Sequence, residues 1–122
     1  MKKQETGRLG ENIACDFLRK NGYKIIETNY RCRDGEIDII TQQQDTLVFV
    51  EVRTKRSFFF GSPEESITQT KKEHLRAVAE HYNQNHENLP PEWRIDVIAI
   101  EIDRDGKVHR IEIIENAIED IA

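Results

Sequence analysis

The 122-residue sequence lacks the features of a secreted or membrane protein. Its only cysteines, Cys15 and Cys32, are 17 positions apart and form no CxxC pair, so neither a zinc knuckle nor a disulfide framework is expected. No apolar run approaches the roughly 20 residues that span a bilayer. No apolar stretch follows the first residues, as a signal peptide would require. We therefore expect a cytoplasmic protein with no membrane partner.

Apolar residues are also scarce, at 37%, whereas charged residues make up 34% of the chain. The charged share of a typical globular domain is about 25%. The apolar residues nevertheless fall in periodic clusters, which argues against disorder. A chain of this length corresponds to one domain. We expect residues 1–122 to fold as a single domain.

The net charge of −5 argues against indiscriminate binding of polyanions, but the charge is unevenly distributed. Residues 1–60 carry 11 basic and 9 acidic side chains, a balance of +2, whereas residues 61–122 carry 7 and 14, a balance of −7. A polyanion is therefore expected to approach the N-terminal half.

Hydrophobic periodicity predicts the element order αβββαββ, a mixed sheet flanked by two helices. The Ser62-Pro63-Glu64-Glu65 stretch is typical of a helix start, with serine as the N-cap and proline in the first turn. The most continuous apolar strand, 95–100, is expected to be central. The predicted elements are a helix from Thr6 or Gly7 to residue 21, strands over 23–30, 36–40 and 47–53, a helix after Ser62, strands over 95–100 and 108–114, and a short tail from Glu115, helical or irregular.

Two acidic residues, Asp38 and Glu51, interrupt apolar strand patterns. A hairpin loop over 43–46 would place them directly opposite each other, with Cβ atoms about 4.5–5.5 Å apart. Such carboxylates repel unless a cation lies between them, and oxygen ligands suit Mg²⁺ or Mn²⁺. The same spacing is also compatible with an ordinary surface ladder of ion pairs that includes Arg53, and spacing alone slightly favours that interpretation.

A cationic group, Arg53-Thr54-Lys55-Arg56, follows Glu51 directly. It is positioned to hold a phosphate or to stabilise a pentacovalent centre. A metal site next to a cationic group that can hold a phosphate indicates phosphodiester hydrolysis. Glu11 is a third candidate, because it lies at the edge of the first helix's apolar stripe. A solvated glutamate in an early helical turn is the simpler interpretation of that residue.

Five ordered motifs carry a resemblance to a known family. They are Gly7-Arg8-Leu9-Gly10-Glu11, Gly35-Glu36-Ile37-Asp38, Phe49-Val50-Glu51-Val52-Arg53-Thr54-Lys55, Phe60-Gly61-Ser62-Pro63-Glu64 and Arg94-Ile95-Asp96-Val97. Over roughly residues 5–101 the chain resembles the YraN family, uncharacterised bacterial proteins placed in the PD-(D/E)XK nuclease superfamily near archaeal Holliday-junction resolvases. Residues 102–122 add the last strand and an acidic tail.

The resemblance implies a restriction-endonuclease-like α/β core and a site for Mg²⁺ or Mn²⁺. Asp38 and Glu51 would be the superfamily's metal-binding acids, and Glu11 the helix glutamate that completes many resolvase-like sites. Lys71 would contact the DNA backbone from the second helix. Arg31, Arg94 and Asp96 also match family positions. Arg31 joins Lys55 and Arg56 as a candidate for DNA binding, whereas Arg94 and Asp96 have no assigned role.

One position departs from the superfamily pattern. The third residue of the (D/E)XK element is usually lysine, whereas this chain has Arg53 there and Lys55 two residues later, so the pair looks exchanged. Arginine stays charged and cannot act as a base, although it can clamp a phosphate. Lys55 shares the strand face with Arg53 but lies about 7 Å further along. Catalysis is therefore less firmly implied than fold or metal binding.

Three functions remain open at this point. The first is a metal-dependent endonuclease acting on DNA, with branched, damaged or partly single-stranded DNA as candidate substrates. The second is a nucleic-acid-binding module with the same fold that does not cut. The third is a protein-interaction domain using Phe58–Phe60, a run that is more simply explained by packing than by base stacking. A homodimer would suit a resolvase-like enzyme that cuts paired strands, but no sequence pattern demonstrates one.

Overall fold

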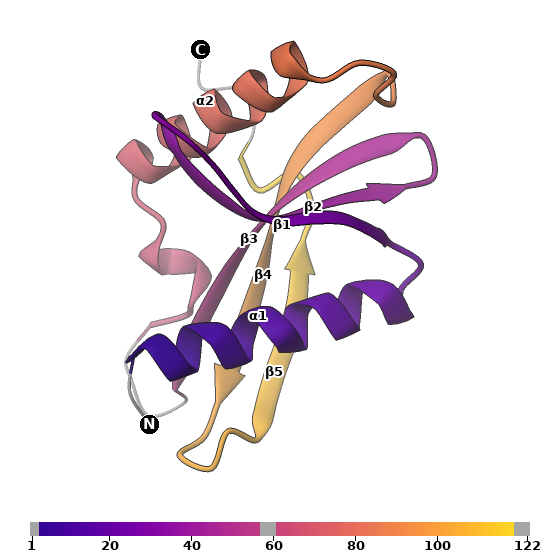
Figure 1. Ribbon diagram of the computed structural model, residues 1–122. Coiled ribbons are helices and arrows are strands. Elements are labelled where there is room, and N and C mark those ends of the chain that lie inside the picture. The colour runs from indigo at the N-terminus through magenta and orange to yellow at the C-terminus, as the bar shows by residue number, and fades with distance from the viewer. Residues whose placement is uncertain (1–2, 57–60, 119–122) are drawn as a thin grey trace.

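The computed structural model describes residues 3–56 and 61–118 and confirms the predicted α/β domain with a mixed sheet and two flanking helices (Figure 1). The elements are α1 (Lys3–Lys20), β1 (Lys24–Cys32), β2 (Gly35–Gln43), β3 (Thr46–Arg56), the short 3₁₀ helix η1 (Glu64–Ser66), α2 (Gln69–Asn85), β4 (Glu92–Ile102) and β5 (Val108–Ile114). The five strands follow the order β1-β2-β3-β4-β5. Only β3 and β4 are parallel. This arrangement is compatible with a restriction-endonuclease-like core.

The two helices cover opposite faces of the sheet, and consecutive residues of β3 show this. Val48 and Val50 pack in the core cluster that contains Ala14 and Leu18 of α1. Phe49, between them, packs in the cluster that contains Leu75 of α2. Side chains of a strand alternate between faces, so Glu51 and Arg53 share the α2 face with Phe49.

The β2–β3 hairpin has the predicted register but a tighter turn. Gln42 lies opposite Leu47, as expected, and Gln43 also pairs with Thr46, so the loop is shortened to two residues. Gln44 accommodates this turn with a positive φ of 54°. The tighter loop leaves the alignment of the two strands unchanged.

The predicted start of the second helix was wrong. Ser62 and Pro63 precede only η1, after which Ile67 takes an extended conformation (φ −83°, ψ 112°) that interrupts the helical path. Thr68 is the actual N-cap of α2, and its side chain accepts a hydrogen bond from the Lys71 N–H at 3.1 Å. Two capping signals lie six residues apart, and tertiary packing favours the second.

Smaller points concern the middle strand of the sheet, the tail and the cysteines. The middle strand is β3 rather than β4, although residues 95–100 are buried on both faces as expected. The tail is not helical over residues 115–118, where Asn116 adopts a positive φ of 51°. Both cysteines are free, and the Phe58–Phe60 run lies outside the described residues.

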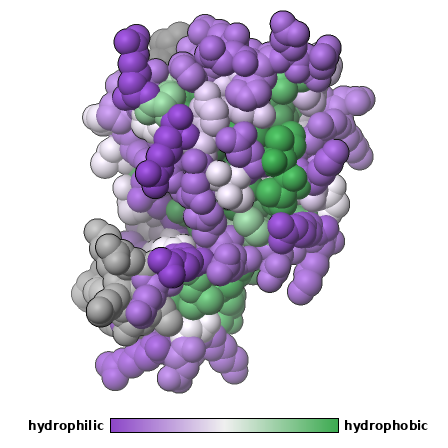
Figure 2. Space-filling model, in the orientation of Figure 1, coloured by the Kyte–Doolittle hydropathy of each residue, from purple (hydrophilic) through white to green (hydrophobic). Residues whose placement is uncertain are grey.

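The visible surface is mostly hydrophilic, with small hydrophobic patches (Figure 2). Among the described residues, the large hydrophobic side chains that are exposed are Ile26 and Val108. No helix in the same part of the chain has the length and apolar character needed to cross a membrane. Most of the apolar surface is therefore used in the two core clusters.

Candidate active site

The site forms where β2 and β3 separate. Their backbone pairing ends at Ile39 opposite Val50, one residue before Asp38 would face Glu51. Beyond this point the Val52 N–H donates to the Asp38 carboxylate (N to Oδ2, 2.8 Å). The Asp38 side chain thus takes the hydrogen bond that a neighbouring backbone carbonyl would accept in a continuing sheet. The remainder of β3 diverges from β2 and lines a cavity.

The structure brings Asp38 and Glu51 together in a mostly buried environment. Glu51 is 5% exposed, and the half-buried Asp38 is hydrogen-bonded to it. Burial, the negative charge of Glu51 and this hydrogen bond raise the pKa of Asp38 to about 8, against the opposing effect of the Val52 N–H. At neutral pH the pair therefore holds one proton, the state expected of two close carboxyl groups without a cation.

Two cations contact the same oxygen of Glu51. Nη2 of Arg53 lies 3.2 Å from Glu51 Oε2, and Nζ of Lys71 lies 3.6 Å from that oxygen. Nε of Arg53 is buried and, among the described residues, has no hydrogen-bond partner. A buried unpaired donor is costly, and a water molecule or a ligand oxygen would satisfy it.

Glu11 faces the same region from α1. Its Oε1 accepts a hydrogen bond from Nδ2 of Asn29 at 2.8 Å. Burial raises the pKa of Glu11, and the charges of Asp38 and Glu36 add to this effect while the Asn29 hydrogen bond opposes it. Glu11 thus lines the cavity, close enough to Asp38 and Glu36 for their charges to raise its pKa.

Gly10 explains how α1 comes so close to the sheet. A Cβ atom at this position would overlap the Thr54 side-chain hydroxyl of β3. The absence of a side chain lets the helix backbone approach the strand at this point, next to Glu11. Gly10, the second glycine of the first sequence motif, therefore has a packing role that positions the neighbouring glutamate.

A cavity of about 830 Å³ joins these elements. Both faces of β3 contribute to it because β2 has diverged, and α1, β1, the start of β2 and η1 complete its wall. The lining residues are Thr6, Gly7, Glu11, Asn29, Glu36, Asp38, Val52, Arg53, Thr54, Lys55, Arg56 and Ser66. Acidic and basic side chains therefore line one hollow, as binding of a metal and a phosphate together would require. Asn29 and Ser66 were not found from the sequence, where neither interrupts a pattern.

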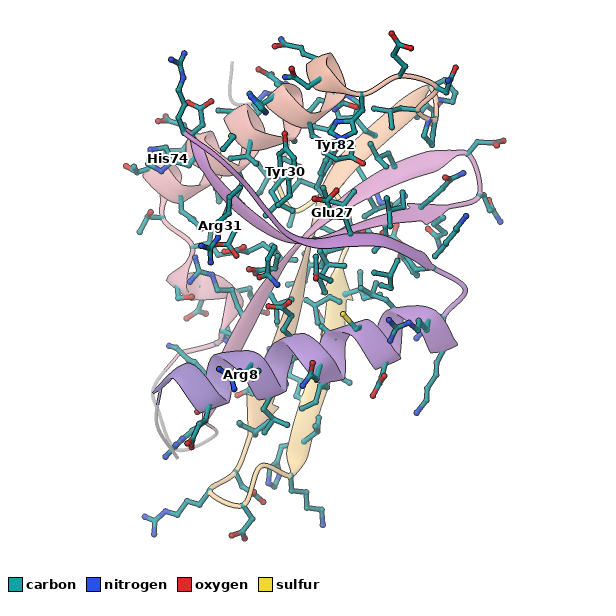
Figure 3. All side chains as sticks on the ribbon, in the orientation of Figure 1. Arg8, Glu27, Tyr30, Arg31, His74 and Tyr82 are labelled. Atoms are coloured by element: carbon teal, nitrogen blue, oxygen red, sulfur yellow. The ribbon has the colours of Figure 1, made fainter. Side chains whose placement is uncertain are left out.

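Other predicted residues lie outside the cavity. Figure 3 shows Arg31 on β1 in the space between the two helices, and its Nε donates to Oε2 of Glu36, which lines the cavity, at 2.9 Å. Asp96 is fully buried and accepts hydrogen bonds from Arg94 at 3.0 Å and from the Asn116 N–H at 2.8 Å. The bond from Asn116 ties the tail to β4, and the bond from Arg94 pairs the buried carboxylate within β4, which gives Arg94 and Asp96 a structural role.

The donor set suits a hard divalent cation held by few protein ligands. Within residues 3–56 and 61–118, no three histidine, cysteine or acidic side chains come together as a metal-binding group. Asp38 and Glu51 offer two carboxylates, and Mg²⁺ commonly binds through one or two carboxylates with water and phosphate oxygens as further ligands. A divalent cation would also replace the proton that the pair holds. The residues present therefore fit Mg²⁺ or Mn²⁺ better than zinc.

Comparisons with known proteins identify relatives along nearly the whole chain. Residues 10–100 match the sequence model of an uncharacterised protein family, UPF0102. A UPF0102 protein of Caldicellulosiruptor saccharolyticus is 44% identical over 117 residues, covering 96% of this chain and 99% of the relative. One from Caldicellulosiruptor bescii is 46% identical over 118 residues with the same coverage, and one from Dehalococcoides mccartyi is 46% identical over 118 residues, covering 95% and 94%. UPF0102 is the YraN family, so the resemblance stated from the motifs is confirmed.

Proposed function

The chain belongs to the uncharacterised protein family UPF0102, and from the geometry of its site we propose that it is a divalent-metal-dependent endonuclease that hydrolyses DNA phosphodiester bonds. The observation that carries the proposal is the pairing of Asp38, which lines a cavity together with basic side chains, with the buried Glu51. In a surface ladder of ion pairs, two carboxyl groups would not be hydrogen-bonded to each other with one of them buried. Two adjacent carboxyl groups are instead a donor set that a divalent cation could bind.

The residues divide the chemistry between them. Asp38 and Glu51 would hold Mg²⁺ or Mn²⁺, which when bound lowers the pKa of a coordinated water and polarises a phosphate. Arg53 and Lys55 would stabilise the negative charge that develops on the phosphate. Glu11, 2.8 Å from Asn29, would orient water on the α1 side of the cavity.

The overall reaction adds one water molecule across a phosphodiester. A bond forms from the water oxygen to phosphorus, and the bond from phosphorus to one ester oxygen breaks. The products are a phosphomonoester and a free hydroxyl, which takes up one proton. The basic residues that would bind the flanking backbone are Arg31, Lys55 and Arg56.

A non-cleaving nucleic-acid-binding module is the second candidate, and Arg53 is the observation that favours it. Its guanidinium is committed to Glu51 at 3.2 Å and cannot give up a proton in a protein. A site that has exchanged lysine for arginine retains its attraction for phosphate and loses one means of moving protons.

The deciding experiment measures cleavage of a labelled panel of duplex, single-stranded, flap and four-way-junction DNA with Mg²⁺ or Mn²⁺. We expect structure-selective cutting by the wild type and its loss in Asp38→Ala and Glu51→Ala. Asp45→Ala is the matched control, because it removes an exposed carboxylate at the opposite end of the same hairpin. Cutting that persists in Asp38→Ala would refute the proposal. If the wild type binds DNA without cutting it, and Arg53→Lys gains cutting, the protein is the non-cleaving nucleic-acid-binding module.

A further inference from the structure

We propose that Lys71 is a positioning residue of the active site, which holds the Glu51 carboxylate in place for metal binding and hydrolysis, rather than a contact to the DNA backbone. This inference rests on the proposed function and assigns a task within that same site. It starts from the ion pair between Nζ of Lys71 and Oε2 of Glu51, which are 3.6 Å apart and joined across two elements, α2 and β3.

The helix directs Lys71 towards the sheet. Leu75 lies four residues further along α2, on the same helical face, and is 1% exposed in the core cluster that contains Phe49. Phe49 and Glu51 share one face of β3, so the helix face that buries Leu75 against the sheet also brings Lys71 over Glu51. The position is therefore inward-facing, and the Lys71 side chain is only 34% exposed.

The first turn of α2 fixes the backbone that carries this side chain. The Lys71 N–H donates to Oγ1 of Thr68 at 3.1 Å, and the Lys72 N–H donates to the Thr68 carbonyl at 3.0 Å. The start of this helix at Thr68, six residues after the site predicted from sequence, places Lys71 in the first turn. A helix capped at Ser62 would have a different path here, so the second cap determines which side chain reaches Glu51.

The two cations act together on one carboxylate. Arg53 and Lys71 both contact Oε2 of Glu51, one from the neighbouring position on β3 and the other from α2. Contacts from two directions restrict rotation of the carboxylate, and a misplacement of about 1 Å at a reacting centre can lower the rate about 100-fold. Lys71 also restores an ammonium group to a site in which arginine replaces the expected lysine. Its charge would oppose metal binding while keeping the ligand correctly oriented.

These opposing effects give a signature that a stabilising residue or a backbone contact would not produce. In Lys71→Gln we expect the single-turnover cleavage rate to fall about 100-fold with little change in DNA affinity. The Mn²⁺ affinity of the same protein should rise several-fold, because a positive charge has left the site. Lys71→Arg should recover most of the rate, since it keeps the charge at a similar distance. Lys72→Gln is the matched control, with the same charge change in the same helical turn and no ion pair to Glu51.

The experiment combines Mn²⁺ binding by calorimetry, DNA binding in Ca²⁺ and single-turnover cleavage for the wild type and these three variants. Weaker DNA binding with an unchanged cleavage rate in Lys71→Gln would overturn the proposal in favour of a backbone contact. An unchanged or weaker Mn²⁺ affinity would overturn it as well, whatever happens to cleavage. A wild type that neither binds Mn²⁺ nor cuts would instead refute the proposed function itself.

Discussion

The Asp38–Glu51 pair makes the stability of the metal-free protein depend on pH in an unusual direction. The folded protein raises the pKa of Asp38 to about 8, whereas an unfolded chain returns it to the ordinary value of 3.8. Between these values the folded state holds a proton that the unfolded state has released. The stabilisation associated with this proton is therefore complete below about pH 4 and is lost as the pH rises towards 8.

The Asp38→Asn variant isolates this effect, because a side-chain amide resembles the protonated acid. Its oxygen can accept from the Val52 N–H and its NH₂ group can donate to Glu51, as the protonated carboxyl does. One proton contributes about 1.4 kcal/mol per pH unit. From pH 5 to pH 7 the free energy of unfolding of the wild type should therefore fall relative to that of the variant by about 3 kcal/mol.

Urea denaturation in the presence of EDTA at pH 5, 6 and 7 measures this difference. The variant should already be the more stable protein at pH 5, and the difference should widen by about 3 kcal/mol by pH 7. Asp45→Asn, at the exposed turn of the same hairpin, should follow the wild type throughout. Mg²⁺ or Mn²⁺ at pH 7 should stabilise the wild type more than Asp38→Asn, because binding to the native state adds to its free energy of unfolding. Parallel pH profiles for the wild type and Asp38→Asn would refute the shared-proton interpretation.

Three further predictions concern the residues that support the site. Gly10→Ala should lower the free energy of unfolding by about 1–3 kcal/mol, because the added Cβ overlaps β3. Gly7→Ala, whose Cβ would meet no atom within 4 Å, should cost nothing. Equal effects of the two substitutions in chemical denaturation would contradict the packing role of Gly10. Glu64→Gln should cost about 1 kcal/mol at pH 7, because Arg110 donates to both carboxylate oxygens of Glu64 and holds η1 on β5. Arg110 lowers the pKa of Glu64 to about 2, so the difference in stability between the wild type and the variant should disappear as the pH falls from 4.5 towards 2. Asp96→Ala should cost about 3–5 kcal/mol in the same assay, because it removes the fully buried carboxylate that pairs with Arg94 and accepts from the Asn116 N–H, with the Mn²⁺ affinity of the folded protein unchanged.

The opposed carboxylates show how much of the site local patterning could predict. Alternation along two strands identified Asp38 and Glu51, and the short polar segment between the strands constrained their register. The turn differed in length from the expected loop, yet the alignment was the same because an extra pair closed the hairpin. This part of the prediction succeeded because strand faces and hairpin registers depend on residues close together in the sequence.

The start of α2 shows where local patterning was insufficient. Ser62 and Thr68 are both acceptable caps, and the sequence around Ser62 has the stronger signal. The structure uses the weaker signal because an extended residue at Ile67 separates η1 from the helix that packs Leu75 into the core. Competition between local signals was therefore decided by burial, which no capping rule contains.

By itself, the sequence determined the order of helices and strands, the faces of each strand and the meeting of Asp38 with Glu51, because each follows from periodicity or from a short connection. Only the tertiary structure decided that Lys71 reaches Glu51, that Gly10 lets α1 approach β3 and that Asp38 keeps a proton near neutral pH. The Lys71–Glu51 contact and the approach of α1 at Gly10 depend on where helices and strands cross. The proton on Asp38 depends on how far these elements exclude water. Side-chain packing across the whole domain sets the crossing points and the exclusion of water, and residues distant in sequence contribute to both.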